Sequence, residues 1–179
     1  MKKNIVVVDK NDNFIKLEEK MKVHELGLLH RAFSLLIFNS NNEMLIHKRA
    51  SSKYHCPGLW SNACCSHPTL YGDIIKDIEK RLEEEMGMKA FDFKELFKFI
   101  YRIDFDNGLT ENEVDRVFVA FSDEKPNPNP EEVEDYKYIK IKDLYEDIKN
   151  NPDNYTYWFK EILNHEKFLE YIKNQSSNL

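Results

Sequence analysis

The sequence predicts an α/β fold in which helices cover a mixed β-sheet. Short apolar runs bounded by turn residues dominate the first two-thirds of the chain. An amphipathic helical pattern interrupts them, and further helical patterns follow. Since a sheet must bury its apolar faces against another layer, helices between and after the strands predict a layered domain. At 179 residues the chain is expected to form one domain, residues 1–179.

Each expected strand is an apolar run that ends at turn-forming residues. Residues 33–38 and 44–48 predict a hairpin, because four Asn and Ser residues separate them. The other expected strands are 5–8, 97–105, 114–121 and 136–141. Asn107-Gly108 lies in the loop before strand 114–121, and Pro126, Pro128 and Pro130 lie in the loop before strand 136–141.

Helices are expected over residues 74–86, 142–150 and 155–173, and Gly87 ends the first of these. In that first helix Glu85 lies within the apolar stripe, where an ionised carboxylate needs a partner. Two interpretations are open. Arg81 one turn earlier pairs with Glu85, or Glu85 binds a cation that accompanies a phosphate.

Composition and charge exclude several classes of partner. With 26 basic and 32 acidic residues the net charge is −6, which indicates neither a nucleic acid nor an anionic membrane. No stretch approaches the roughly 18 apolar residues of a membrane span, and the first ten residues do not resemble a signal segment. Three cysteines, an odd number, predict no disulfide framework and a reducing, cytoplasmic location.

Two short segments carry chemistry. His67 precedes a proline and is therefore expected to be extended, so Cys65 and His67 point to one side. Glu111 and Glu113 share a side by the same alternation. Together with His24 and His30 they would form a ligand set that suits Zn²⁺, Mn²⁺ or Fe²⁺ better than Mg²⁺.

Alternatives without function remain for each member. A single histidine is more often a core or surface residue than a ligand, and His47, His55 and His165 are assigned to that class. The basic candidates are Lys20, Arg49, Lys53 and Arg81, which could bind a diphosphate or could be surface charge. Tyr101 and Trp158 could line an apolar pocket or pack in the core. Cys56 and Cys64 are expected to be small buried residues.

Four segments together resemble the type I isopentenyl-diphosphate isomerase family. They are Arg49-Ala50-Ser51-Ser52-Lys53, Pro57-Gly58-Leu59-Trp60-Ser61-Asn62, Cys65-Ser66-His67-Pro68 and Glu111-Asn112-Glu113-Val114. The resemblance runs from about residue 5 to residue 158. It implies a Nudix-type α/β/α sandwich with a mixed sheet.

A hydrolytic Nudix box has the pattern G-x5-E-x7-R-E-U-x-E-E-x-G-U. Aligned on Gly87, the chain has Glu84 and Glu85 in place but Lys80-Arg81 where Arg-Glu is required. Gly72 stands where the first glutamate belongs, and Ser66 replaces the first glycine. The degraded box argues against diphosphate hydrolysis and for the isomerase.

The resemblance implies the roles of individual residues. One Mn²⁺ or Zn²⁺ would bind His24, His30, His67, Glu111 and Glu113, and one Mg²⁺ would join the substrate diphosphate to Glu85 and the Cys65 carbonyl. Lys20, Arg49, Lys53 and Arg81 would contact the diphosphate. Cys65 and Glu113 would transfer protons, with Tyr101 and Trp158 around the hydrocarbon. Ser66 stands where the family has glycine, and the spacing from His24 to His30 is shorter than in the family.

The implied reaction interconverts isopentenyl and dimethylallyl diphosphate through a tertiary carbocation. The expected partner is a small-molecule diphosphate, and the expected assembly is a monomer or a homodimer. Two alternatives are a Nudix-type diphosphate hydrolase and a non-catalytic member of the fold that binds a diphosphate or a partner protein.

Overall fold

The computed structural model describes residues 3–53 and 55–176. The strands in these ranges are β1 (Asn4–Val8), β2 (Phe14–Glu19), β3 (His30–Phe38), β4 (Glu43–Arg49), β5 (Trp60–Asn62), β6 (Cys64–Ser66), β7 (Phe91–Asp104), β8 (Thr110–Phe121) and β9 (Val133–Lys140). The helices are α1 (Lys20–Leu26), α2 (Ile74–Met86), α3 (Ile141–Asn150), the 3₁₀ turn η1 (Pro152–Asn154), α4 (Tyr157–Asn164) and α5 (Glu166–Ser176).

Strand β3 is the centre of one mixed sheet. It pairs antiparallel with β1, β4 and β6 and parallel with β8. The long β7–β8 hairpin lies on one side, and β5 and β9 both pair with β4 on the other. The sheet is mixed because β3 and β8 pair in parallel, and a mixed sheet was predicted.

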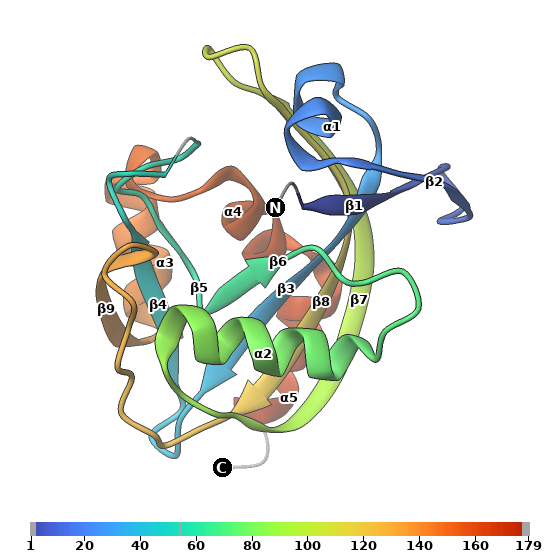
Figure 1. The fold of residues 1–179 in the computed structure, drawn as a ribbon. Coiled ribbons are helices and arrows are strands. Elements are labelled where there is room, and N and C mark those ends of the chain that lie inside the picture. The colour runs from blue at the N-terminus through green and yellow to red at the C-terminus, as the bar shows by residue number, and fades with distance from the viewer. Residues whose placement is uncertain (1–2, 54, 177–179) are drawn as a thin grey trace.

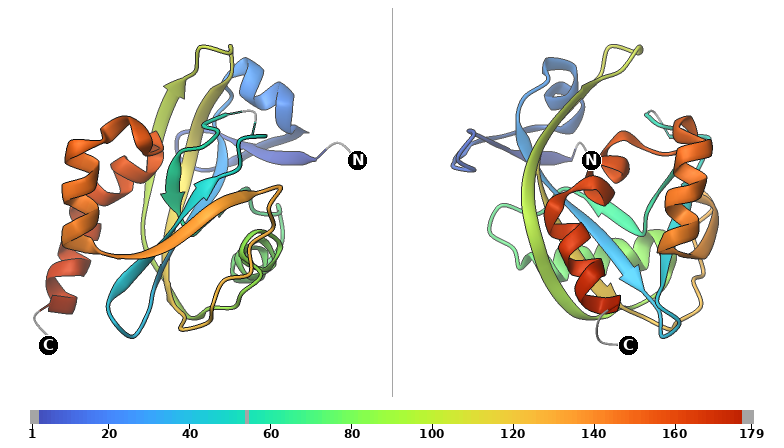
Figure 2. Two further views of the ribbon diagram at one scale, coloured as in Figure 1. Left: turned by 90° about the vertical axis from the view of Figure 1, so that its left-hand side faces the viewer. Right: turned by 180° about the vertical axis from the view of Figure 1, so that it is seen from behind.

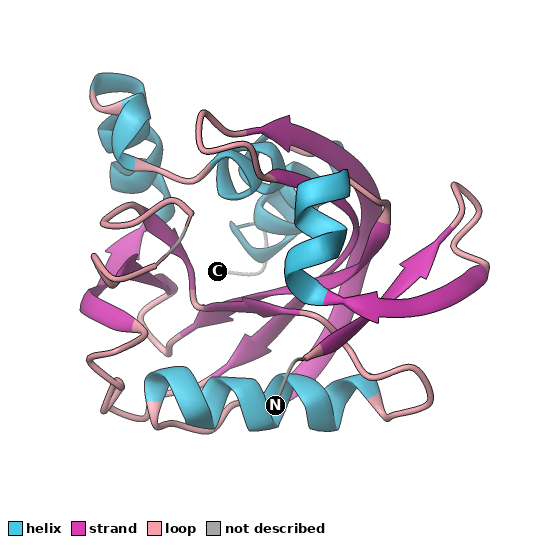
Figure 3. Ribbon diagram, turned by 45° about the horizontal axis from the view of Figure 1, so that its top comes forward, coloured by secondary structure: helices cyan, strands magenta, loops and turns pink. Residues whose placement is uncertain are grey.

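Helices cover both faces of this sheet. Helix α2 lies against one face, and α3, α4 and α5 lie against the other (Figures 1 and 2). Successive side chains of β3 point to opposite faces of the sheet and so contribute to both hydrophobic cores. Leu35 packs under α2, whereas Leu36 packs with α4 and α5. Figure 3, which is coloured by secondary structure, shows the strands between the two helical layers. The α/β/α sandwich is therefore confirmed.

The predicted strands and the first two predicted helices are all present, although β7 begins six residues and β8 four residues earlier than predicted. The predicted helix over 155–173 is wrong as a single element, because the chain turns at His165 between α4 and α5. His165 has φ −69° and ψ 136°, and its ring stacks on Phe97 with centroids 3.8 Å apart. The turn lets Ile162 in α4 and Phe168 in α5 both reach the same core.

The sequence did not predict β2, α1, β5 or β6. Strand β2 lacks alternation, since Phe14, Ile15 and Leu17 are all exposed. The other three elements are too short to show a periodic pattern. No helix among the described residues is long and apolar enough to cross a bilayer.

Gly87, which ends α2, closely approaches the backbone of Asn127, and Gly108 is a matched control for testing that contact. Both have positive φ, 57° and 81°, where a side chain costs about 1–2 kcal/mol. A Cβ at Gly87 would also collide with the carbonyl oxygen of Asn127, whereas no described atom lies within 4 Å of a Cβ at Gly108. We expect urea unfolding to show a loss of about 1 kcal/mol for Gly108→Ala and at least twice that for Gly87→Ala. Equal losses would contradict the proposed contact.

Candidate active site

A cavity of about 420 Å³ is lined by residues of α1, α4 and β6, among other elements. These three elements are labelled in Figure 1. Its size is that of a small-molecule site. Every predicted site residue except His24 and His30 lines it. The lining residues among these are Lys20, Arg49, Lys53, Cys65, His67, Arg81, Glu85, Tyr101, Glu111, Glu113 and Trp158.

At one wall of the cavity, four side chains converge, of which His67 and Glu111 line the cavity and His24 and His30 lie behind them. One ligand atom each from His24, His30, His67 and Glu111 lies within 4.8 Å of all the others. Ligand atoms about 2.1 Å from a common ion lie about 3 to 4.2 Å apart, so the spacing is close to that of a metal site. The Oε1 of Glu113 adjoins this group, 3.3 Å from the Nε2 of both His30 and His67.

Local structure brings these residues together from distant parts of the chain. Gly27 adopts a left-handed conformation with φ 59° and ends α1, which turns the chain back into β3. His24 and His30 therefore meet across the turn, with ring centroids 5.0 Å apart. The parallel register of β3 and β8 places His30 opposite Glu113.

Backbone carbonyls fix two of the imidazole rings. The Nδ1 of His24 donates to the carbonyl of Lys20 at 2.6 Å, and the Nδ1 of His30 donates to that of Leu28 at 2.8 Å. An imidazole whose Nδ1 carries the proton presents the lone pair of Nε2, the atom that binds a metal. Both rings direct Nε2 into the cluster.

The unpaired nitrogens of His30 and His67 supply the test of fit for a metal ion. The Nε2 of each is buried and makes no hydrogen bond to any described residue, although each faces a carboxylate oxygen at 3.3 Å. The Nδ1 of His30 donates to Leu28, so in neutral His30 the Nε2 lone pair faces the carboxylate, which is unfavourable unless a proton or a metal cation lies between them. Three imidazoles and two carboxylates also suit Zn²⁺ or Mn²⁺ chemically. These residues fit a divalent transition metal.

Opposing effects set the charge of the two carboxylates. Burial alone would raise the pKa of Glu111, but contacts with His24 and His55 hold it well below its ordinary value. Burial and the neighbouring Glu111 would likewise raise the pKa of Glu113, and His30 and His67 lower it instead. Both groups are therefore ionised at neutral pH in this arrangement.

Two proton-bearing groups face the cavity beside Glu113. Burial raises the pKa of the Cys65 thiol to about 12, against a smaller lowering by Arg49, so the thiol stays protonated at neutral pH. The hydroxyl of Tyr101 donates to Oε2 of Glu113 at 2.6 Å. Cys65 and Glu113 thus face one cavity in opposite protonation states.

Basic side chains surround another part of the cavity. Arg49 donates through Nε to the carbonyl of Cys56 at 3.2 Å and lies over the ring of Trp158, 5.4 Å from its centroid. Arg81 pairs through Nη2 with Glu85 Oε1 at 2.5 Å and Glu132 Oε2 at 3.0 Å. The Arg81–Glu85 pair, one of the two interpretations left open by the sequence, is therefore present.

Among the lining residues that were not predicted to belong to the site, three bear on its chemistry: Lys3, His55 and Glu132. Glu132 also pairs with Lys53, and Lys3 lies at the cavity wall. His55, which was not expected to be a ligand, lies with its Nε2 2.7 Å from Oε1 of Glu111 and lines the cavity, a contact that the sequence did not predict. Only its position two residues after Lys53 could have indicated this. His47 is buried in β4 and His165 packs on Phe97, both away from the cavity lining.

Comparisons with known proteins give the family. Residues 28–159 match the model of the NUDIX domain. Isopentenyl-diphosphate Delta-isomerase 1 of Aromatoleum aromaticum is 43% identical over 163 residues, which cover 91% of this chain and 92% of that protein. Isopentenyl-diphosphate Delta-isomerase 1 of Photorhabdus laumondii is 44% identical over 160 residues, 88% of this chain and 91% of its own length.

Solved structures agree on the fold. The crystal structure of DR0079 from Deinococcus radiodurans superposes with a TM-score of 0.67 and 15% identity, over 83% of this chain and 90% of that one. At this identity the likeness concerns the fold alone.

The cluster predicts that a divalent metal stabilises the protein. A ligand that binds only the folded state at 100 times its Kd adds about 2.7 kcal/mol to stability. We expect Mn²⁺ added to chelator-treated protein to raise its Tm, and His67→Ala to lose most of that increase. The matched control His165→Ala should retain it. An equal rise in Tm for His67→Ala and the parent would contradict the assignment of the metal to this cluster.

Proposed function

Because this chain belongs to the NUDIX family and, within it, to the isopentenyl-diphosphate Delta-isomerases, we propose that it converts isopentenyl diphosphate to dimethylallyl diphosphate. The observation that carries the proposal is that Cys65 and Glu113 line one cavity beside the buried cluster of histidines and glutamates. The reaction moves a double bond by adding a proton to one carbon and removing a proton from another. It therefore requires two groups that exchange protons within one cavity.

Two metal ions belong to this proposal. His24, His30, His67, Glu111 and Glu113 would hold Mn²⁺ or Zn²⁺, and Glu85 with the Cys65 carbonyl would meet a Mg²⁺ that accompanies the diphosphate. When bound, these ions supply positive charge that tunes the acidity of Glu113 and offsets the charge of the substrate.

The diphosphate would lie among Lys20, Arg49, Lys53 and Arg81. All four line the cavity, and Arg49 and Arg81 offer planar donors suited to phosphate oxygens. Lys53 and Arg81 both contact Glu132. Binding of the diphosphate would replace Glu132 as their anionic partner.

Cys65 and Glu113 would transfer the protons. The thiol holds a proton that it can donate, and the carboxylate can accept a proton. Together the two groups can add one proton to the substrate and remove another. In the product-forming direction one group gives its proton to the alkene, a tertiary carbocation forms, and the other group removes a proton from the carbon on the far side. Tyr101, which donates to Glu113, would hold that carboxylate in position.

Trp158 would face the reacting hydrocarbon. The indole Nε1 donates to the hydroxyl of Ser61 at 3.1 Å, which fixes the ring at the cavity wall. A cation near the face of an indole gains about 0.5–2 kcal/mol. The rings of Trp158 and Tyr101, which line the cavity, would also help to keep water from the carbocation, which water would convert to an alcohol.

The remaining parts of the proposal concern the whole chain. We infer that residues 1–179 act as one domain, as a monomer or a homodimer, in the cytoplasm. The degraded Nudix box, with Arg81 where a hydrolase requires glutamate, argues against hydrolysis of the diphosphate.

The first test is turnover with Cys65→Ser. With isopentenyl diphosphate, Mg²⁺ and Mn²⁺ we expect the parent protein to form the allylic isomer and to release no phosphate. Cys65→Ser should lose about 10²–10⁴-fold in kcat, the range for removal of a positioned proton donor or acceptor. Cys64→Ser, a change in the neighbouring buried thiol, is the matched control and should retain activity. Full activity of Cys65→Ser, or phosphate release by the parent, would refute the proposal.

The second test separates metal binding from proton transfer at Glu113. Glu113→Gln removes the carboxylate that adjoins the cluster and accepts from Tyr101, so we expect both metal content and activity to fall. Tyr101→Phe removes only the hydroxyl, and metal content should stay near that of the parent while kcat decreases. Elemental analysis and product assays on the same preparations measure both. A metal-loaded and active Glu113→Gln variant would contradict this role.

A further inference from the structure

We propose that His55 is a positioning residue for the metal centre. Its Nε2 donates a hydrogen bond to Oε1 of Glu111 and thereby leaves the other oxygen of Glu111 to the metal. This inference rests on the proposed metal site and adds a residue outside its ligand set. It also predicts that Glu111 binds the metal through one oxygen only.

The two oxygens of Glu111 have different neighbours. Oε1 lies 2.7 Å from Nε2 of His55, whereas Oε2 lies 3.2 Å from Nε2 of His24 and 3.8 Å from Nε2 of His30. Only 3% of Glu111 is exposed, so water cannot readily replace either neighbour. A carboxylate held in this way has its rotation about the last bond fixed by His55.

The geometry favours a hydrogen-bond donor over an additional ligand. The four residues whose ligand atoms share one small volume are His24, His30, His67 and Glu111, and His55 is not among them. Its nearest partner is the Glu111 oxygen that faces away from the other imidazoles. Hydrogen-bond donors of this kind, which contact a ligand rather than the metal, orient the ligand and tune the site.

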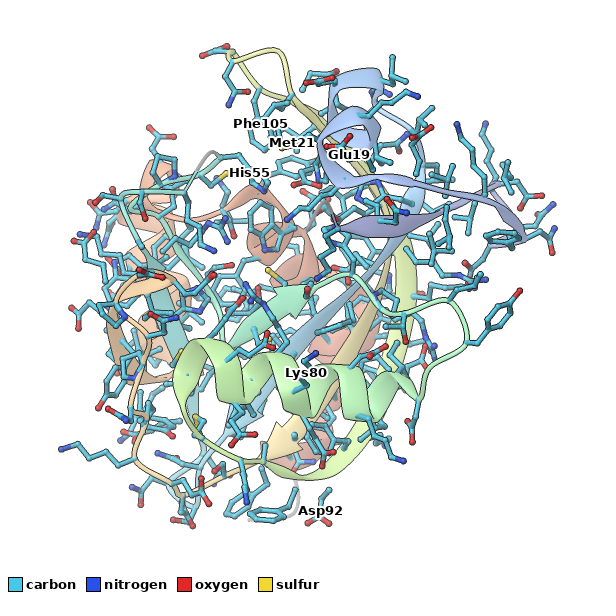
Figure 4. The ribbon with its side chains drawn as sticks, viewed as in Figure 1. Glu19, Met21, His55, Lys80, Asp92 and Phe105 are labelled. Carbon is cyan, nitrogen blue, oxygen red and sulfur yellow. The ribbon has the colours of Figure 1, made fainter. Side chains whose placement is uncertain are left out.

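Aromatic contacts hold the His55 ring in this position. It stacks on Phe105, with centroids 5.6 Å apart and an interplanar angle of 12°, and meets Trp158 edge-on at 6.4 Å. Figure 4 shows His55 and Phe105 at the same end of the molecule, where the loop after β4 and the turn between β7 and β8 approach each other. Arg49 fixes the backbone, because Nη2 donates to the carbonyl of His55 at 3.2 Å.

The same loop connects the metal centre to the basic part of the cavity. Lys53, two residues before His55, lines the cavity and pairs with Glu132. Through His55 the loop is also attached to Glu111. The position of the loop therefore affects both a proposed metal ligand and a proposed diphosphate contact.

Two substitutions separate the donor from the ring. His55→Gln keeps an N–H donor but loses the aromatic ring, whereas His55→Phe keeps a ring that can stack on Phe105 but loses the donor. Chelator-treated protein is titrated with Mn²⁺ alone, and free Mn²⁺ is measured by electron paramagnetic resonance. We expect His55→Phe to bind Mn²⁺ about 10–100-fold more weakly than the parent, the usual effect of losing a hydrogen bond to a metal ligand. His55→Gln should stay within about fivefold of the parent.

Two further variants calibrate the measurement. His165→Gln makes the same change outside the cavity and should bind Mn²⁺ as the parent does. His24→Gln removes a proposed ligand and should lose most binding. Parent-like affinity in His55→Phe would overturn the inference. A loss in His55→Gln as large as that in His24→Gln would also overturn it, because His55 would then be a ligand itself.

The titration contains no substrate, so its result is independent of the reaction. If the isomerase proposal fails, no allylic product forms although the order of Mn²⁺ affinities remains. If only the role of His55 fails, the parent forms product and the His55→Phe affinity is unchanged.

Discussion

The structure depends on two carboxylates that are buried side by side. Glu111 and Glu113 are 3% and 8% exposed, and they occupy the same side of β8. Ionised groups removed from water need opposite charge or hydrogen bonds close by. His24, His30, His55 and His67 supply such contacts around them, and a divalent cation would complete the charge balance. The proposed chemistry of the cavity follows from this arrangement, because Glu113, whose carboxylate adjoins the cluster, lines the same cavity as Cys65.

The fold assembles this cluster at one end of a mixed sheet. Parallel pairing of β3 with β8 brings His30 beside Glu113, and antiparallel pairing of β3 with β6 places Cys65 opposite Ser34. Helices on both faces bury the sheet and leave the cavity open where α1, α4 and β6 meet. The proposed ligands thus come from a helix, two strands and the segment after a third strand, and small changes in strand register would separate them.

The sequence predicted the layered fold, the central hairpin and α2, because these elements have clear apolar patterns and turn residues at their ends. It also predicted the convergence of His24, His30, His67 and Glu111. It could not predict His55 or Glu132, since each reaches the site through a loop whose course depends on tertiary contacts such as the Arg49 hydrogen bonds. The division of the last helix at His165 was missed for the same reason, because stacking on Phe97 is a long-range contact.

The central claim is that Cys65 and Glu113 act on opposite sides of one bound hydrocarbon beside a metal centre. Diffraction from crystals grown with Mn²⁺, Mg²⁺ and isopentyl diphosphate, a saturated analogue that cannot react, tests it most directly. Anomalous scattering locates Mn²⁺, and the analogue marks the position of the substrate. The account predicts Mn²⁺ among His24, His67 and Glu111, with the Cys65 thiol and the Glu113 carboxylate on opposite faces of the hydrocarbon. A hydrocarbon bound elsewhere, or both groups on one face, would contradict it.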